Sequence, residues 1–159
     1  SIETSNELAS IIDSVKKNKN YKINPSTKTF QAIRIFVNNE LTELILGLIE
    51  ATKLLQKDGI LIVISFHSLE DKIVKNFFNL YSNLRKNPSR YLPVKENKSD
   101  LFKLLSKKHI GPTILEIKKN IRSRSAKLRY AVRNNNSFFY PKEFIKKFEN
   151  YLKLERVSI

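Results

Sequence analysis

In the first third of the chain, apolar residues recur every three or four positions, which is the spacing of amphipathic helices. Thr4-Ser5-Asn6-Glu7 has the spacing of a capping box, so the first helix is expected to start there and to end near Lys16. A second helix is expected from Ser26 or Thr27, and a third ends at the Lys57-Asp58-Gly59 turn. Their apolar faces are Leu8, Ile11, Ile12 and Val15, then Phe30, Ile33, Phe36 and Val37, then Leu41, Leu44, Ile45, Leu48, Thr52 and Leu55.

The pattern changes at Ile60, where an unbroken apolar run continues to Phe66. Such a run between a glycine turn and a polar residue is typical of a strand buried on both faces of a parallel sheet. Ser68 is expected to cap the next helix, with Asp71 in its first turn. The buried side of that helix is Ile73, Val74, Phe77, Phe78 and Tyr81. Helix, strand and helix form the unit of a doubly wound sheet, so an α/β fold is expected.

The second half predicts a basic loop over residues 82–99 and two strands, 101–105 and 125–132, around a short helix at 112–119. The connection between the two strands is too long for a tight hairpin but suits an antiparallel pair at a sheet edge. A final basic amphipathic helix starts at Pro141. Its apolar face is Phe144, Ile145, Phe148, Tyr151 and Leu152.

Charge is distributed unevenly along the chain, whose formal net charge is +15. Residues 1–80 carry 10 Lys and Arg against 9 Asp and Glu, and residues 81–159 carry 20 against 6. A one-sided positive excess attracts polyanions, and RNA is the leading candidate. Codon bias is the alternative, because Lys, Asn and Ile abound, but bias alone does not explain why the first half stays balanced.

Composition limits the class of protein further. With 41% hydrophobic residues, the chain can form one globular core. There is no cysteine, which excludes disulfides and thiolate metal sites. No apolar run approaches the roughly 18 residues of a membrane span, and the N-terminus lacks the pattern of a signal peptide. A cytoplasmic location without a membrane partner is therefore expected.

Three segments resemble the signatures of one enzyme family in order and in approximate spacing. They are residues 27–41 (TKTFQAIRIFVNNEL), 64–71 (ISFHSLED) and 122–129 (RSRSAKLR). Together they resemble the bacterial methyltransferases of the MraW/RsmH type, which modify one cytosine of 16S ribosomal RNA at its N4 nitrogen. The resemblance spans nearly all of residues 2–133.

The resemblance implies a class I methyltransferase that uses S-adenosyl-L-methionine and has a helical domain inserted into its Rossmann-like sheet. On this basis residues 1–37 are the end of the insertion, residues 38–133 are the C-terminal half of the Rossmann-like domain, and residues 134–159 are a C-terminal basic amphipathic helix. Its partner would be 16S ribosomal RNA or the small ribosomal subunit. No metal is expected.

The family's glycine-rich cofactor loop has no counterpart in this sequence. Gly47, Gly59 and Gly111 are the only glycines, and none of the segments around them imitates that loop. The expectation is therefore a C-terminal fragment without cofactor-binding residues, which is inactive without the N-terminal part that would precede Ser1.

The expected catalytic or target-base region is the segment at the carboxyl end of the central strand, where open α/β sheets place their sites. It comprises Ser65, Phe66, His67, Ser68 and Asp71. Phe66 can stack on a base, and His67 can hydrogen-bond to its edge. The alternative is structural: Phe66 belongs to the core, while Ser68 and Asp71 satisfy helix-terminal amides. For His67 both interpretations stay open, and for Ser68 and Asp71 capping is favoured.

The third signature is expected to contact RNA phosphates through Arg122, Arg124, Ser125, Lys127 and Arg129. The alternative is a solvated strand face. In the first signature, residues 31 and 34 lie one helical turn apart.

Gln31 and Arg34 could face either a nucleotide of the substrate or the missing domain, and a buried polar bridge between domains is favoured because both lie beside an apolar stripe. Two other functions stay open for the chain as a whole. One is a non-catalytic basic RNA-binding remnant, and the other is a basic hydrolase that uses His67, for which no distant nucleophile is evident.

Overall fold

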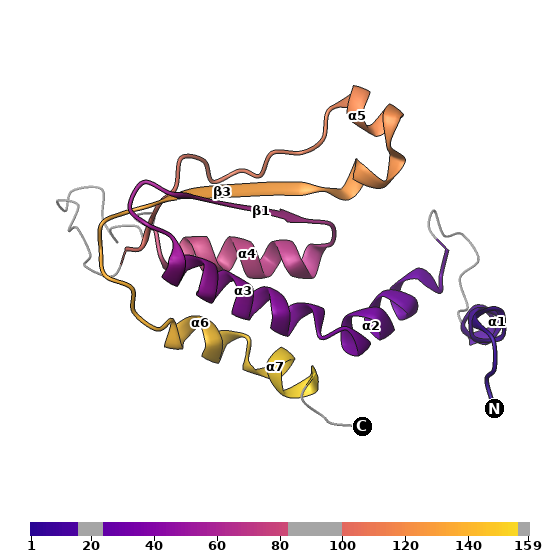
Figure 1. The fold of residues 1–159 in the computed structure, drawn as a ribbon. Coiled ribbons are helices and arrows are strands. Elements are labelled where there is room, and N and C mark those ends of the chain that lie inside the picture. Colours follow the sequence, from indigo (N-terminus) through magenta and orange to yellow (C-terminus); the bar gives the residue numbers. More distant parts are fainter. Residues whose placement is uncertain (16–23, 83–99, 156–159) are drawn as a thin grey trace, which may run out of the picture. The chain divides into compact units, whose positions relative to one another are not determined.

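The computed structural model describes residues 1–15, 24–82 and 100–155. The chain forms two compact units, Ser1–Glu40 and Leu41–Val157, which are described separately (Figure 1). The combination of helices and a small sheet confirms the predicted α/β class. Most of the predicted basic loop, residues 83–99, lies outside the described residues.

The first unit contains α1 (Ser5–Val15) and α2 (Thr27–Val37). The capping box predicted for α1 is confirmed, because the Glu7 amide donates to Thr4 Oγ1 at 3.3 Å and the Thr4 amide donates to the Glu7 carboxylate at 3.4 Å. Ser26 precedes α2 as predicted, but its side chain makes no capping hydrogen bond. The Ser26 hydroxyl instead donates to Asn24 Oδ1 at 2.6 Å, so α2 begins without a side-chain cap from this serine.

The second unit contains a three-stranded antiparallel sheet in the order β1, β3, β2. The strands are β1 (Ile60–Ser65), β2 (Phe102–Lys103) and β3 (Lys127–Arg133). The antiparallel pairing predicted for the two C-terminal segments is confirmed, although β2 is shorter than predicted and β3 lies in the centre of the sheet. The parallel neighbour predicted for β1 is not what these residues show, since β1 pairs antiparallel with β3.

Among the described residues, one face of this sheet has exposed apolar side chains on β1. Residues directly opposite each other in an antiparallel ladder share a face, so alternate residues of β1 line up with alternate residues of β3. The pairs on the exposed face are Ile60 with Val132, Ile62 with Tyr130 and Ile64 with Leu128. The three isoleucines are 54%, 57% and 55% exposed, so the prediction of a strand buried on both faces is wrong. The reason is that α4 packs on the opposite face only, as Figure 1 shows.

The core lies between the sheet and the helices α3 (Glu40–Leu54) and α4 (Ser68–Leu80). Ring contacts join elements that are distant in sequence: Phe77 of α4 packs edge-on against Phe102 of β2 and against Phe144. Each fully buried aromatic side chain of this kind contributes about 1.5–3 kcal/mol to the free energy of unfolding. The predicted apolar faces of α3 and α4 are therefore largely confirmed as core.

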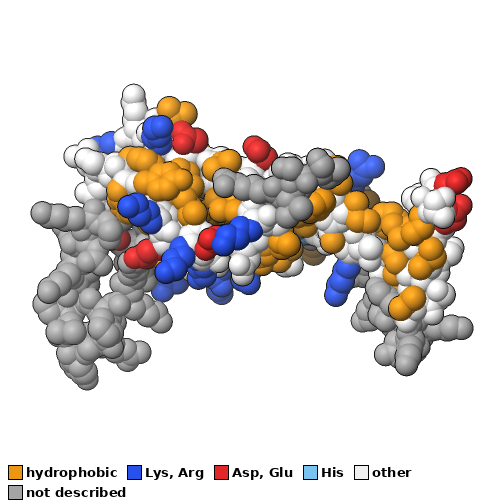
Figure 2. All heavy atoms as spheres, turned by 90° about the horizontal axis from the view of Figure 1, so that it is seen from below, with side chains coloured by type: hydrophobic (Ala, Val, Ile, Leu, Met, Phe, Trp, Pro, Cys, Tyr) orange, Lys and Arg blue, Asp and Glu red, His pale blue; other side chains and the backbone are white. Residues whose placement is uncertain are grey.

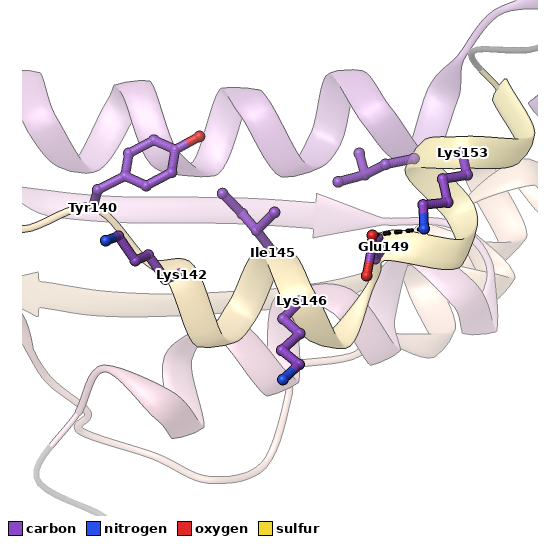
Figure 3. A pocket seen from close by; sticks show the side chains of 7 residues that line it. Tyr140, Lys142, Ile145, Lys146, Glu149 and Lys153 are labelled. Atoms are coloured by element: carbon purple, nitrogen blue, oxygen red, sulfur yellow. Dashed lines mark ion pairs between the residues drawn. The ribbon is translucent and has the colours of Figure 1, made fainter.

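The predicted final helix is divided in two, α6 (Lys142–Lys147) and α7 (Glu149–Glu155), because Phe148 leaves the helical conformation between them. Its apolar face packs inward, and the Phe144 amide donates to the Tyr81 hydroxyl of the segment after α4 at 3.4 Å. The outer surface of α6 and α7 carries Lys side chains among apolar ones (Figure 2). On α7, Lys153 pairs with Glu149 at 2.7 Å (Figure 3).

The segment before β3 folds into the helix α5 (Ile114–Lys119) and the 3-10 helix η1 (Ile121–Ser125). The short helix predicted after Pro112 is confirmed, and its amide at Glu116 donates to Thr113 Oγ1 at 3.2 Å. The predicted strand over 125–132 begins later than expected, because η1 occupies its start. Within the described residues, no helix has both the length and the apolar character needed to cross a bilayer.

Candidate functional site at the carboxyl end of β1

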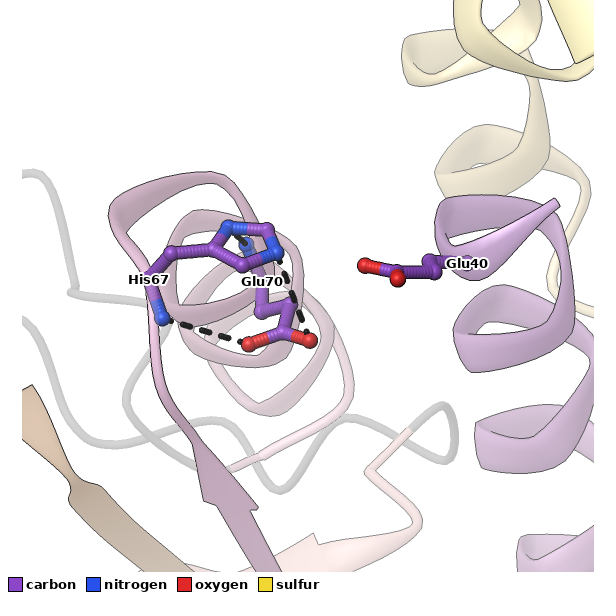
Figure 4. A group of neighbouring side chains, drawn as sticks. All are labelled: Glu40, His67 and Glu70. Atoms are coloured by element: carbon purple, nitrogen blue, oxygen red, sulfur yellow. Dashed lines mark hydrogen bonds and ion pairs between the residues drawn. The ribbon is translucent and has the colours of Figure 1, made fainter. Parts of the chain in front are cut away.

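The turn after β1 is held by a capping box formed by His67 and Glu70 (Figure 4). The Glu70 amide donates to His67 Nδ1 at 3.4 Å, and Glu70 Oε2 accepts from the amides of Phe66 at 2.8 Å and His67 at 3.2 Å. His67 is therefore the N-cap of α4, and Ser68 is its first helical residue. The prediction that Ser68 and Asp71 cap the helix is wrong. The capping groups are the His67 imidazole and the Glu70 carboxylate, each one residue earlier in the sequence than predicted.

The hydrogen bond to Nδ1 indicates which tautomer a neutral His67 imidazole adopts. Because Nδ1 accepts a hydrogen bond, a neutral His67 carries its proton on Nε2, which lies 3.4 Å from Glu70 Oε1. The His67 side chain is only 10% exposed. Phe66, the residue before it, is 55% exposed, so the alternative that Phe66 belongs to the core is wrong. The turn thus buries a histidine and presents an aromatic ring to solvent.

Asp71 connects the turn after β1 with β3. Its carboxylate accepts from Arg129 Nε at 2.7 Å and from Lys127 Nζ at 3.2 Å. Arg129 also donates through Nη1 to the Lys107 carbonyl at 3.1 Å. Ser65, which is buried at the end of β1, donates to the Lys127 carbonyl at 3.3 Å. Two of the three sequence signatures, distant along the chain, are therefore joined by hydrogen bonds.

The charge state of Asp71 follows from these contacts. Burial raises the pKa of Asp71, but the hydrogen bonds and positive charges of Arg129 and Lys127 lower it more. The net effect is a pKa below the ordinary value of an aspartate. Asp71 is thus a permanently ionised anchor at neutral pH and not a proton-transferring group.

The residues of the third signature divide into an exposed and a buried set. Arg122, Arg124 and Ser125 are exposed on η1, and Lys127 is half-buried against Asp71. Arg129 is only 9% exposed and its guanidinium is engaged by Asp71, so it is not presented to a phosphate. The alternation of β3 is the physical reason, because Arg129 points to the face that α4 covers.

Several structural residues of this region were not identified from the sequence. The sequence does not indicate Glu70 as a capping residue, because its capping partner is a histidine, which is an unusual N-cap residue. Asn120 caps η1 by accepting from the Arg122 amide at 3.1 Å, and the buried Ser123 hydroxyl donates to the Asn120 carbonyl at 2.8 Å. An asparagine side chain commonly accepts a hydrogen bond from the amide two residues later, so Asn120 is the sequence signal that could have identified this cap.

The first signature lies, up to Glu40, in the unit Ser1–Glu40. Arg34 makes a two-point ion pair with Glu40, with Nε and Nη2 at 2.7 and 3.1 Å from the two carboxylate oxygens. Gln31 is half-buried on α2. The interpretation of Gln31 and Arg34 as a bridge between domains stays a prediction.

The glycines provide a test for a cofactor loop. Gly47 lies inside α3, Gly111 precedes α5, and Gly59 is in the turn that enters β1. A Cβ at Gly59 would lie 2.8 Å from Leu55 Cγ, so this glycine allows a tight turn rather than the approach of a ligand. None of the three follows a strand and opens a helix, so the described residues do not fit an S-adenosylmethionine loop.

Comparison with known proteins identifies the family. Residues 1–134 match the model of the MraW methylase family. The chain belongs to this family. Among relatives named ribosomal RNA small subunit methyltransferase H, the protein of Ehrlichia canis (strain Jake) is 51% identical over 129 residues, which are 80% of this chain and 41% of the relative. The protein of Borreliella burgdorferi (strain ZS7) is 50% identical over 128 residues, 80% of this chain and 38% of the relative.

A third relative with the same name, from Rickettsia africae (strain ESF-5), is 46% identical over 134 residues, which are 82% of this chain and 43% of the relative. The chain therefore spans about two-fifths of the length of the curated relatives that it matches. The part that matches the MraW family includes the turn after β1 and all of β3, and it ends before α6 and α7.

Proposed function

We propose that this chain is the C-terminal part of an enzyme that uses S-adenosyl-L-methionine to methylate N4 of a cytosine in 16S ribosomal RNA. Its membership of the MraW methylase family and the name shared by its relatives support a role in methylation of small-subunit ribosomal RNA. The observation that carries the proposal is the link from Asp71 to Arg129 and Lys127, which brings the second and third signatures together at one end of the sheet. We place the enzyme in the cytoplasm.

The open sheet supports a joint Rossmann-like domain. Within the described residues, β1 is an edge strand that pairs only with β3, and its Ile60, Ile62 and Ile64 side chains are more than half exposed. An exposed hydrophobic edge strand is a surface that natural proteins cover. An N-terminal part with further strands and a helix, which would also supply the cofactor loop, accounts for this surface.

The residues of this chain have roles in holding the RNA. Phe66 stacks on the target base or a neighbouring one, because it is the exposed aromatic ring of the turn. Arg122 and Arg124 contact backbone phosphates, with Ser125 beside them. Asp71, Lys127 and Arg129 position the two segments, and His67 holds the turn that presents Phe66.

A reconstitution experiment tests the proposal. This chain is co-expressed with the N-terminal part of the Ehrlichia canis relative, up to the start of its matched segment, and the complex is incubated with small ribosomal subunits and labelled S-adenosylmethionine. Digestion of the RNA to nucleosides and mass spectrometry should identify N4-methylcytidine. Each part alone should transfer no label.

The same experiment separates the alternatives. Methylation at another nucleotide or at another atom of cytosine would overturn the proposed specificity. Tight RNA binding by this chain, with no methylation after reconstitution, would favour the non-catalytic RNA-binding protein that the basic second half also allows.

A further inference from the structure

The C-terminal helices form a pocket outside the residues that match the MraW family. The pocket has a volume of about 480 Å³ and is lined by residues of α6 and α7 and by Tyr140, two residues before α6. This volume is in the range that accommodates small ligands or single nucleotides. It is lined by Tyr140, Lys142, Ile145, Lys146, Glu149, Leu152 and Lys153.

The pocket combines an apolar floor with a basic rim. Tyr140 is 57% exposed, and its ring reaches in the same direction as Ile145, while the side chains of Lys142 and Lys146 point in different directions, with the amine of Lys146 turned away from the ring (Figure 3). Leu152, which also lines the pocket, is buried. An exposed aromatic ring with cations beside it is the arrangement by which proteins hold single-stranded nucleic acid, stacking a base and neutralising its phosphate.

The charges of the rim are not equivalent. Lys153 is paired with Glu149 at 2.7 Å, and the hydrogen bond and charge of Lys153, with a smaller effect from the charge of Lys146, lower the pKa of Glu149, so the Glu149 carboxylate stays ionised and offsets the charge of Lys153. Over residues 1–15, 24–82 and 100–155, neither Lys142 nor Lys146 forms an ion pair. These two amines, four residues apart on α6, are therefore the ones available to an anion.

We propose that this pocket binds a nucleotide of single-stranded RNA, with the base on Tyr140 and the phosphate at Lys142 and Lys146. That the polyanion is RNA rests on the proposed function. The apolar floor favours a nucleotide over a simple anion, because Ile145 and Leu152 offer a phosphate no hydrogen bond. The site extends RNA contact to a segment that the MraW family match does not include.

Binding of a fluorescent ten-nucleotide polyuridine to the full chain tests the site by anisotropy at several salt concentrations. Tyr140→Ala should weaken binding about tenfold, as loss of one stacked base does, and Tyr140→Phe should bind like the unaltered chain. Lys142→Ala with Lys146→Ala should reduce the slope of log affinity against log salt by about 1.4, because each phosphate contact on a single strand contributes about 0.7.

Lys72→Ala with Lys75→Ala is the matched control, since these lysines are exposed one helical turn apart on α4, neither forms an ion pair within the described part of the chain, and their removal changes the net charge equally. The proposal is overturned if this control changes the slope as much as the α6 pair, or if Tyr140→Ala binds within twofold of the unaltered chain. Equal competition by a phosphorylated peptide would also overturn it, because a peptide offers no base to stack.

Photo-cross-linking supplies a readout that does not depend on stability. A 5-iodouridine oligonucleotide should cross-link to the peptide that contains Tyr140, and cross-links confined to other peptides would contradict the site. This outcome is independent of the reconstitution. A cross-link at Tyr140 without methylation would support the nucleotide site and contradict the proposed enzyme activity. Methylation without the cross-link would support the enzyme activity and contradict the nucleotide site.

Discussion

Asp71 and Arg129 are 58 residues apart in the sequence and are joined by an ion pair of 2.7 Å. Asp71 belongs to the first turn of α4, and Arg129 lies on the central strand. Their side chains are 13% and 9% exposed, so water competes weakly for either group. The pair therefore fixes the helix after β1 against β3 at the end of the sheet where the candidate site lies.

Replacement of Asp71 should destabilise the chain. Asp71→Asn leaves the buried guanidinium of Arg129 without its counter-charge, and the free energy of unfolding should fall by about 1–3 kcal/mol. Urea unfolding measures this change. Asp58→Asn is the control, since the Asp58 carboxylate is exposed and lies 3.9 Å from Lys57. It should change stability by less than about 0.5 kcal/mol. Equal changes in the free energy of unfolding for the two variants would show that the buried pair stabilises the chain no more than an exposed carboxylate does.

The same pair should make stability depend on pH in the acid range. Because the pKa of Asp71 is lowered in the folded chain, its contribution is complete above the unfolded pKa of about 4 and is lost as pH falls through the folded value. Stability should therefore decrease more steeply below about pH 4 in the unaltered chain than in Asp71→Asn. Melting temperatures at a series of pH values measure the difference, and parallel curves would contradict it.

Arg129 also shows where sequence reasoning ends. A strand over residues 125–132 was predicted, but its buried face was not identified. Lysine and arginine stand at alternate positions of this strand, and such residues are expected on the face that meets solvent. The structure places Arg129 on the covered face, where a partner far away in sequence balances its charge. Such a pairing carries no local signal.

RNA binding should separate the exposed arginines from the buried one. Arg122→Ala with Arg124→Ala should lower the salt slope of RNA binding by up to about 1.4 to 1.8 with little change in stability, if each contacts a phosphate. Arg129→Ala should instead destabilise the fold, because Asp71 loses its main partner. Anisotropy and urea unfolding on the same preparations test both statements. A slope unchanged in the double variant would assign Arg122 and Arg124 no role in RNA binding.

The exposed face of β1 should be needed for assembly with an N-terminal part. Ile62→Lys should leave the stability of the isolated chain within about 0.5 kcal/mol, because its side chain is already 57% exposed. In a complex that covers this face, the ammonium group would be buried without a partner, so association should weaken by more than about tenfold. The control is Leu54→Lys on α3, where the side chain is 79% exposed.

Affinity capture of the N-terminal part of the Ehrlichia canis relative by tagged versions of this chain measures association. Equal capture by the Ile62→Lys and unaltered chains would contradict the proposed use of this face. Both faces of β1 carry apolar side chains, as the sequence predicted. The sequence alone could not show that the described residues cover only one of these faces.

The turn after β1 illustrates the same division between what sequence predicts and what it leaves open. A helix capped by Ser68 was predicted, and the helix itself is confirmed, because the change from an unbroken apolar run to helical spacing is a local signal. The identity of the cap was wrong, since serine is a common capping residue and histidine is not. The choice between them depends on the backbone of the strand, which leaves His67 in an extended conformation at φ −137° and ψ 166°.

His67→Asn and His67→Ala together separate a cap from a catalytic group. Asparagine is among the best N-cap residues and its carbonyl can accept from the Glu70 amide as Nδ1 does, so His67→Asn should retain the stability of the unaltered chain. His67→Ala should lose about 1 kcal/mol of unfolding free energy. If the imidazole acts only as a cap, the reconstituted His67→Asn enzyme should methylate ribosomal RNA at a near-normal rate. If it also contacts the target cytosine, His67→Asn should be stable but slower by on the order of 10–1000-fold. Thermal melts and initial rates on the same preparation decide between the two, because a cap alone cannot produce a stable and slow enzyme.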